Sequence, residues 1–175
     1  MSVALNISTA GETIRHASAT ELAEALQAAR ADTLHTFATY ERALGDLQVP
    51  YRPDLNPPLW ELGHIGWFQE WWLARNPQSK LGLAADPAVQ RLAGVRPQAD
   101  ALYNSSQVPH AARWSLPLPT PDATREDLAL QLTQTLALLE NAHGDDGLYF
   151  FRLALLHEDM HHEAAVYMAQ TLALD

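Results

Sequence analysis

Apolar residues recur at three- and four-residue spacing along four long segments of the chain, which is the pattern of amphipathic helices. The first segment, 18–44, opens with Ser18 and Glu21 at the spacing of a capping box. Its inner stripe consists of Leu22, Leu26, Ala29, Thr33, Phe37, Tyr40 and Leu44. The second segment, 57–75, follows Asn56 as a predicted N-cap and has a proline at its first helical position.

The third segment, 120–143, begins with a threonine cap and a proline, and Gly144 is expected to close it in a left-handed conformation. Its stripe consists of Leu128, Leu132, Thr135 and Leu139. The fourth helix is expected to start at Asp145 or Asp146 and to run to the C-terminus. Sustained strand-like alternation is absent, so we predict an all-α protein with at most a short strand pair in 76–120.

The lengths of the connections predict how the four helices are arranged. Short connections join the first helix to the second and the third to the fourth, which makes each pair antiparallel. Most of the eleven prolines lie in the long irregular stretch 76–120, which is long enough to cross back along the bundle. We therefore predict a four-helix bundle of order up-down-down-up in residues 18–175, preceded by a flexible N-terminal arm, 1–17.

Composition excludes several classes of protein. Charged residues make up 18% of the chain and apolar residues 47%, which is typical of a globular domain. The net charge of −10 disfavours nucleic acid and anionic membranes as partners, and the absence of cysteine excludes thiolate chemistry. There is neither a long apolar span nor the pattern of a secretory signal, so a cytoplasmic location is the expectation.

Histidines on two of the predicted helices form a candidate metal site. His157 and His161 are one turn apart on an otherwise apolar face, where two imidazoles can bind one ion. His64 lies on a seam with Trp60, Trp67 and Trp71 and points into the same interior. Each could instead be a hydrogen-bonded core histidine, but together they predict a three-histidine site with open positions.

Other polar residues are candidates for supporting roles. His162 lies about 100° from His161 around the helix and is not expected to bind the metal, whereas Glu163, about 200° away, is predicted to orient a ligand or to form an ion pair. Trp67 is a second residue expected to pack around the ligands. The long 76–120 segment is predicted to line the pocket, because long ordered loops often carry function. Its candidate substrate-binding residues are Asn104, Ser106, Arg113 and Trp114.

Two motifs resemble those of a known family. L-W-E-L-G-H-I-G-W-F at 59–68 and L-L-H-E-D-M-H-H-E-A at 155–164 are similar to the histidine motifs of the DinB-like domain in ergothioneine-type sulfoxide synthases. The resemblance implies a DinB-like bundle in which His64, His157 and His161 bind non-haem iron(II). The loop Y-N-S-S-Q-V-P-H-A-A-R-W-S-L-P-L-P at 103–119 looks more like the selenoneine synthase branch.

The resemblance also implies an activity. Members of that family join sulfur or selenium to C2 of the trimethylhistidine imidazole, using O2 and a thiol or selenol donor. Neutral imidazole ligands leave iron(II) cationic, which favours an anionic donor, and Arg113 is a candidate to meet a negative group on it. Two features depart from the pattern. Met160 stands where some ergothioneine enzymes have Gln. Family members run on into a second, formylglycine-enzyme-like domain, whereas this sequence stops at Asp175, so we expect it to be either a fragment or a stand-alone first domain.

Three other functions remain open from the sequence. Residues 157–161 also match H-E-x-x-H, the signature of zinc metalloproteases. A DinB-like divalent-metal thiol transferase or hydrolase would use the same three histidines without a second domain. A non-enzymatic bundle with a structural metal is the third alternative, and the identity of the metal discriminates among these readings.

Overall fold

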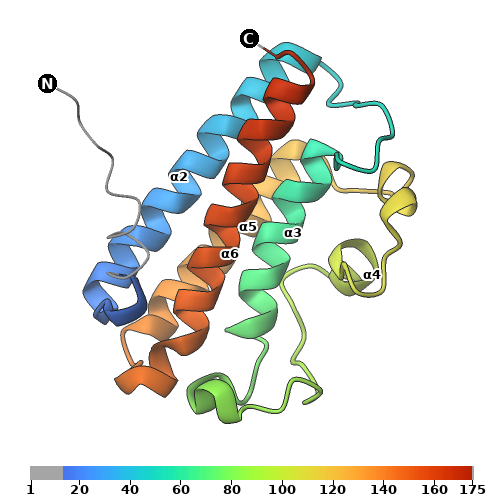
Figure 1. The fold of residues 1–175 in the computed structure, drawn as a ribbon. Helices are drawn as coiled ribbons and strands as arrows, with labels where there is room; N and C mark the ends of the chain where they lie inside the picture. Colours follow the sequence, from blue (N-terminus) through green and yellow to red (C-terminus); the bar gives the residue numbers. More distant parts are fainter. Residues whose placement is uncertain (1–13, 175) are drawn as a thin grey trace, which may run out of the picture.

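The computed structural model describes residues 14–174, and every regular element within them is helical. The all-α prediction is therefore confirmed. In Figure 1, α2 and α6 run side by side in one direction, and α3 and α5 run in the opposite direction. Helix α6 packs on both α2 and α3, and α3 packs on α5. The bounds of the long helices are α2 Ala19–Leu44, α3 Pro58–Trp72, α5 Pro121–Leu139 and α6 Gly144–Thr171.

The caps of α2 and α5 follow the sequence prediction. Ser18 and Glu21 form the capping box, in which the Glu21 carboxylate accepts a 2.8 Å hydrogen bond from the Ser18 backbone N–H. Gly45 follows α2 with a φ of 59°, a left-handed value that glycine tolerates. Thr120 caps α5 by accepting from the Ala123 backbone N–H, and Pro121 is the first helical residue.

Other helix ends differ from the prediction. Helix α3 begins at Pro58 and ends at Trp72, so Pro57 rather than Asn56 precedes it. The Asn56 side chain is not a cap because it is bonded to Glu61 and Arg113. Helix α5 ends at Leu139, short of the expected position 143.

The start of α6 is a further correction. Gly144 has a φ of 70° and is the first residue of α6 rather than the close of α5. Its positive φ lets the chain reverse without a side-chain cap, which places Asp145 and Asp146 in the first turn. Carboxylates there still stabilise the helix through its dipole.

The long connection between α3 and α5 holds three short helices rather than a strand pair. They are η1 Ser79–Ala84, α4 Ala99–Tyr103 and η2 His110–Trp114. Within residues 14–174 there is no strand, so the short pair allowed for in 76–120 is absent. The η1 turn packs against α6, and α4 packs against α3.

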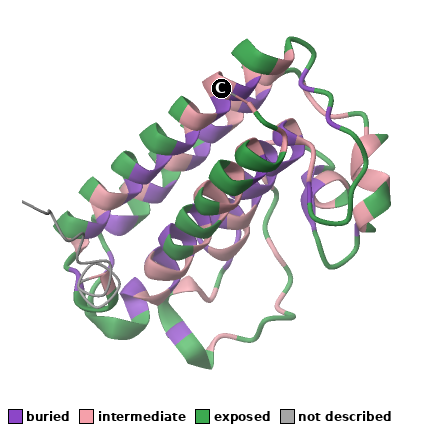
Figure 2. Ribbon diagram, turned by 45° about the horizontal axis from the view of Figure 1, so that its top comes forward, coloured by how far each residue is buried: buried purple, intermediate pink, exposed green. Residues whose placement is uncertain are grey.

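Buried side chains line the faces that the long helices turn toward one another (Figure 2). One cluster joins the beginnings of α2 and α6, and a second joins the later parts of α2 and α6 to the first turns of α3 and to Leu128 of α5. A third consists of Trp60, Trp67, Ala99 and Tyr103, which fasten α3 to the long connection. The third cluster is the one that surrounds His64.

The packed body of the protein begins before Ser18. Ala17 is buried, and Ile14 packs against the cluster at the start of α2 and α6, so the predicted arm does not extend to residue 17. Residues 1–13, for which a flexible arm was expected, lie outside the described residues. Among the helices of the described chain, none is long and apolar enough to cross a membrane.

Candidate metal centre

Two glycines on α3 let neighbouring elements close around His64. A Cβ on Gly63 would overlap the ring of Tyr103, and one on Gly66 would overlap the Gln131 side chain on α5. Glycine therefore allows α4 on one side and α5 on the other to approach the helix backbone. The approach of Tyr103 places its carbonyl oxygen 2.8 Å from Nδ1 of His64.

The structure brings the imidazoles of His64, His157 and His161 together from two helices. Their ring centroids are 4.4–5.1 Å apart. Each ring offers one nitrogen that lies within 4.8 Å of the corresponding nitrogens of the other two rings. The Nε2 atoms of His157 and His161 are 3.1 Å apart. Two nitrogens bound at about 2.1 Å to one ion at a near-right angle lie about 3 Å apart. The spacing of this pair thus fits a shared ion.

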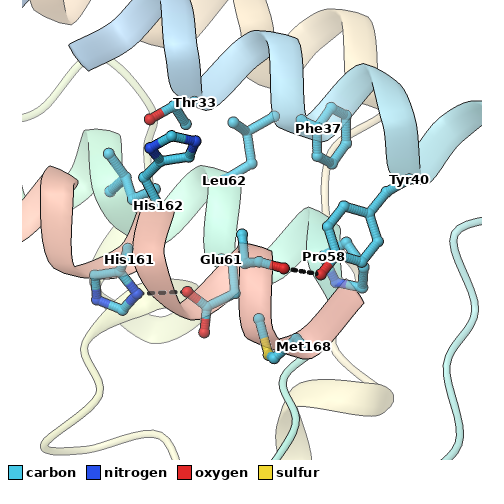
Figure 3. A pocket seen from close by; sticks show the side chains of 11 residues that line it. Thr33, Phe37, Tyr40, Pro58, Glu61, Leu62, His161, His162 and Met168 are labelled. Atoms are coloured by element: carbon cyan, nitrogen blue, oxygen red, sulfur yellow. Dashed lines mark hydrogen bonds and ion pairs between the residues drawn. The ribbon is translucent and has the colours of Figure 1, made fainter. Parts of the chain in front are cut away.

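Hydrogen bonds fix the orientation of two of the three rings. Nδ1 of His64 donates to the Tyr103 carbonyl, and Nδ1 of His161 donates to the Glu61 carboxylate (Figure 3). With the proton on Nδ1, the lone pair of each ring is on Nε2. Partners of this kind orient imidazole ligands in metal sites.

The surroundings keep the imidazoles of His64 and His157 neutral. Trp60 stacks on His64 with centroids 4.7 Å apart, and Phe68 stacks on His157 at 3.5 Å. Burial, with a smaller contribution from the neighbouring His161, lowers the pKa of His64 to about 4 and that of His157 to about 2. Neutral imidazole is the form that binds a metal.

The donor set fits a divalent first-row metal. The lone pairs of His64 and His161 are directed to Nε2, where, within residues 14–174, neither ring has a donor other than a neighbouring imidazole, and Nε2 of His157 faces that of His161 at 3.1 Å. A cation among the three rings would satisfy these lone pairs together. Three neutral nitrogens suit iron, cobalt and zinc alike, so they do not select one metal.

Of the predicted supporting residues, His162 and Glu163 lie apart from the imidazole cluster. His162 points toward α2 (Figure 3), where its Nε2 is 2.8 Å from the Thr36 hydroxyl. Glu163 is exposed and lies along the cleft beside His161. Trp67 packs against His64 with centroids 5.6 Å apart and donates from Nε1 to Asp100.

The loop residues predicted to bind substrate have structural contacts. The Asn104 side-chain oxygen accepts from both the backbone N–H and the hydroxyl of Ser106, which closes a turn. Trp114 donates to the Val49 carbonyl at 2.9 Å. Arg113 lies over the Trp60 ring at 3.9 Å and donates to Asn56. The loop contacts the imidazole cluster through the Tyr103 carbonyl, which meets His64, whereas Arg113 contacts Trp60 and Asn56.

A cleft of about 490 Å³ opens beside His161. Three carboxylates, Asp54, Glu61 and Glu163, lie along it, while neither lysine nor arginine is among its lining residues. Met160 and Tyr167 supply part of its apolar wall. A much smaller and largely apolar cavity of about 30 Å³ lies between α2, α3 and α6 and also touches Glu61 and His161 (Figure 3).

Two acids that the sequence reasoning did not assign have clear roles in the structure. Glu61 contacts His161. The sequence feature that could have indicated this role is an acidic residue one turn before the buried His64 in an apolar seam. Glu158 is 1% exposed and receives two hydrogen bonds from Arg30, at 2.7 and 3.1 Å. In an H-E-x-x-H protease this glutamate would act on the metal-bound water. Its pairing with Arg30 on α2 disfavours that reading.

The fold and this cluster define an all-helical protein with a candidate three-histidine metal centre. No family model matches the chain. It is similar to the hercynine oxygenase of Mycolicibacterium smegmatis, at 32% identity over 153 residues, which cover 87% of this chain and 32% of that protein. The hercynine oxygenases of Mycolicibacterium thermoresistibile and Mycobacterium tuberculosis are each 31% identical over 154 residues, or 88% of this chain. The chain spans about a third of the length of these curated relatives.

Proposed function

We propose that this chain is the metal-binding part of an O2-dependent enzyme that acts on hercynine, the trimethylated histidine, and joins sulfur or selenium to C2 of its imidazole. In this proposal residues 18–174 form a DinB-like bundle of order up-down-down-up. His64, His157 and His161 hold one iron(II) ion. The single observation that carries the proposal is the convergence of these three imidazoles in a chain that is similar over most of its length to hercynine oxygenases.

Iron(II), when bound, would supply a redox-active cation able to engage O2 and a soft anionic donor. The chain's own residues would hold and orient it. Tyr103 and Glu61 fix the Nδ1 protons of two rings, and the indoles of Trp60 and Trp67 exclude water from His64. Water exclusion strengthens the electrostatic interactions inside such a site.

The cleft beside His161 suits a cationic substrate. Asp54 is paired with Arg52, whereas Glu61 and Glu163 form no ion pair with lysine or arginine within residues 14–174, so their charges favour a positive group in the cleft. A trimethylammonium group carries a permanent positive charge and is attracted to aromatic faces such as that of Tyr167. Hercynine placed there would direct its imidazole toward the three histidines.

The second reactant in this proposal is a small thiol or selenol. The resemblance of the 103–119 loop to the selenoneine branch supports selenium. We further propose that a formylglycine-enzyme-like domain completes the pocket, as the greater length of the relatives supports.

The proposal is tested by loading the protein with iron(II) without oxygen and adding hercynine. Hercynine is expected to bind the metal-loaded protein about tenfold more tightly than histidine does, since histidine lacks the trimethylammonium group that aromatic faces attract. Oxygen consumption should then require both hercynine and a thiol or selenol, with a product of matching mass. Equal binding of histidine and hercynine would contradict the proposal.

A divalent-metal thiol transferase is the second candidate. The observation that supports this function is the set of three imidazoles, because neutral imidazole ligands suit a redox-inert ion such as zinc as well as iron. The same assay separates the two functions, because thiol transfer by a zinc-loaded protein proceeds without oxygen. Sulfur or selenium transfer under strict anaerobiosis would support the transferase and exclude the oxygenase.

A further inference from the structure

Glu61 connects two of the three candidate ligands. It lies on α3 one turn before His64, and its side chain is only 8% exposed. Its Oε2 atom accepts a hydrogen bond from Nδ1 of His161 on α6, and its Oε1 atom accepts one from the Asn56 amide. Helix α3 therefore supplies one candidate ligand directly and the hydrogen-bond partner of another.

The hydrogen bonds that reach Glu61 run in one direction. Arg113 donates to the Asn56 side-chain oxygen at 2.8 Å, and the Asn56 amide donates to Glu61. Arginine can only donate and a carboxylate can only accept, so the orientation of the amide between them is fixed. Arg113 is itself held over Trp60 at 3.9 Å.

We propose that Glu61 is a positioning residue for His161, and that Asn56 and Arg113 hold Glu61 in place. The inference rests on the proposed metal site. By accepting from Nδ1, Glu61 keeps the proton off Nε2, orients the ring and raises the basicity of the nitrogen that would bind the metal. The short helix η2, which carries Arg113, is thereby tied to a candidate ligand on α6.

The three histidines differ in the partner of the second ring nitrogen, which makes the role of Glu61 distinct. Nδ1 of His64 is bonded to a neutral carbonyl, and Nδ1 of His157 is buried without a partner. His161 alone among the three has a carboxylate partner in the described chain. A change at residue 61 should thus alter one ligand while leaving the contacts of the other two in place.

The test measures metal affinity rather than turnover. The full chain is stripped of metal and titrated with cobalt(II), whose visible absorption reports the ligand geometry. E61Q is expected to weaken cobalt(II) binding by about 10- to 100-fold and to shift the absorption band. E163Q is the control, because the Glu163 carboxylate lies along the same cleft but touches none of the imidazoles. Its cobalt(II) affinity should stay within about threefold of the wild type, a smaller change than the loss expected for a residue that orients a ligand.

A double variant tests the direction of the chain of hydrogen bonds. In E61Q the glutamine must turn a donor either toward Asn56 or toward His161, so one bond is broken whichever way it lies. Adding N56D should restore a complete set of hydrogen bonds. An aspartate at position 56 would accept from Arg113 and from the glutamine amide, and the glutamine oxygen would then accept from His161. The double variant N56D with E61Q is therefore expected to bind cobalt(II) at least about threefold more tightly than E61Q, which recovers part of the 10- to 100-fold loss.

The outcomes separate this inference from the proposed function. If the wild type does not bind cobalt(II), the metal site itself fails. If the wild type binds and E61Q binds equally well, or E163Q loses as much as E61Q, the positioning role is wrong while the site stands. A double variant no tighter than E61Q would overturn the role of Asn56. Thermal unfolding of each metal-free variant checks the fold, and N56A, which keeps the carboxylate, replaces E61Q if E61Q does not fold. A few-fold loss in N56A would support the inference, and an unchanged affinity would overturn it.

Discussion

Two buried polar clusters meet on α6, and they differ in how fully their groups are hydrogen-bonded. Glu158 belongs to the first, in which both of its oxygens accept from Arg30 on α2. Arg30 also donates to the Leu128 carbonyl and to Gln69, so the pair links all four long helices. Each of the three guanidinium nitrogens donates at least one hydrogen bond, four in all.

The histidine cluster, which begins one residue earlier at His157, is different. Its three imidazoles face one another, with Nε2 of His157 and Nε2 of His161 3.1 Å apart, and among the described residues Nδ1 of His157 is buried without a partner. A buried polar group without a partner costs about 1–3 kcal/mol. The protein retains that penalty at the histidines and avoids it at Arg30 and Glu158. The contrast supports a structural role for the ion pair and supports the proposal that the histidines bind a ligand.

The largest predicted effect breaks the ion pair. R30M leaves the Glu158 carboxylate buried without its cation, and the free energy of unfolding should fall by about 3–5 kcal/mol. Urea denaturation followed by circular dichroism measures it. The double variant R30M with E158L, which buries no charge, should recover most of the loss. A loss below about 1 kcal/mol in R30M, the range of exposed pairs, would show that the pair is not structural.

The next effect tests how closely the histidine cluster is packed. G63A introduces a methyl group where the Tyr103 ring lies, so we expect a loss of about 1–3 kcal/mol in unfolding free energy. G147A on α6 is the matched control, because its Cβ would meet nothing nearer than 3.9 Å. Helix propensity favours alanine there by up to about 1 kcal/mol. Equal thermal shifts in the two variants would contradict the close packing of Tyr103 on α3.

A smaller effect of opposite sign is expected at His157. H157L removes the unpartnered nitrogen, so the metal-free protein should gain about 1 kcal/mol of stability. The same change should lower metal affinity at least about 100-fold if the imidazole is a ligand, because loss of a residue that only orients a ligand lowers affinity by up to about 100-fold. Thermal unfolding and metal titration of one sample measure both. If H157L destabilises the metal-free protein, the imidazole has a structural role and the comparison fails.

The smallest effect concerns Glu70, a third buried carboxylate, which accepts from the Val95 backbone N–H and from the Gln131 amide. Burial raises the pKa of Glu70 above 4.5. The protonated side chain thus stabilises the fold fully below pH 4.5, and this contribution is lost as pH rises through the higher folded-state pKa. Relative to E70Q, the wild type should lose stability as pH rises across that range. Parallel stability profiles for the two proteins would contradict the raised pKa.

The sequence predicted what depends on periodicity. The stripe from Leu22 to Tyr40 is buried as expected, and the spacing of His157 and His161 placed them on one face. The seam of α3 predicted that His64 would be buried among tryptophans, which is confirmed. These features are local to one helix, so spacing alone determines them.

The periodicity of apolar residues did not predict which side chains on different helices contact one another. Glu61 and Glu163 are both acids near a histidine, and only the packing of α3 on α6 shows that Glu61 is the one that contacts His161. Arg30 and Glu158 lie 128 residues apart and carry no shared sequence signal. Asn56 looked like a helix cap because it precedes two prolines, but its amide is needed between Arg113 and Glu61.

The central claim is that the three imidazoles bind one divalent metal, and X-ray absorption of protein loaded with iron(II) tests it most directly. We predict one iron per chain with three imidazole nitrogens at about 2.0–2.2 Å. H64A should lose that signal and H162A, whose imidazole faces Thr36, should keep it. Iron bound with the same stoichiometry and the same imidazole scattering in H64A would contradict the claim.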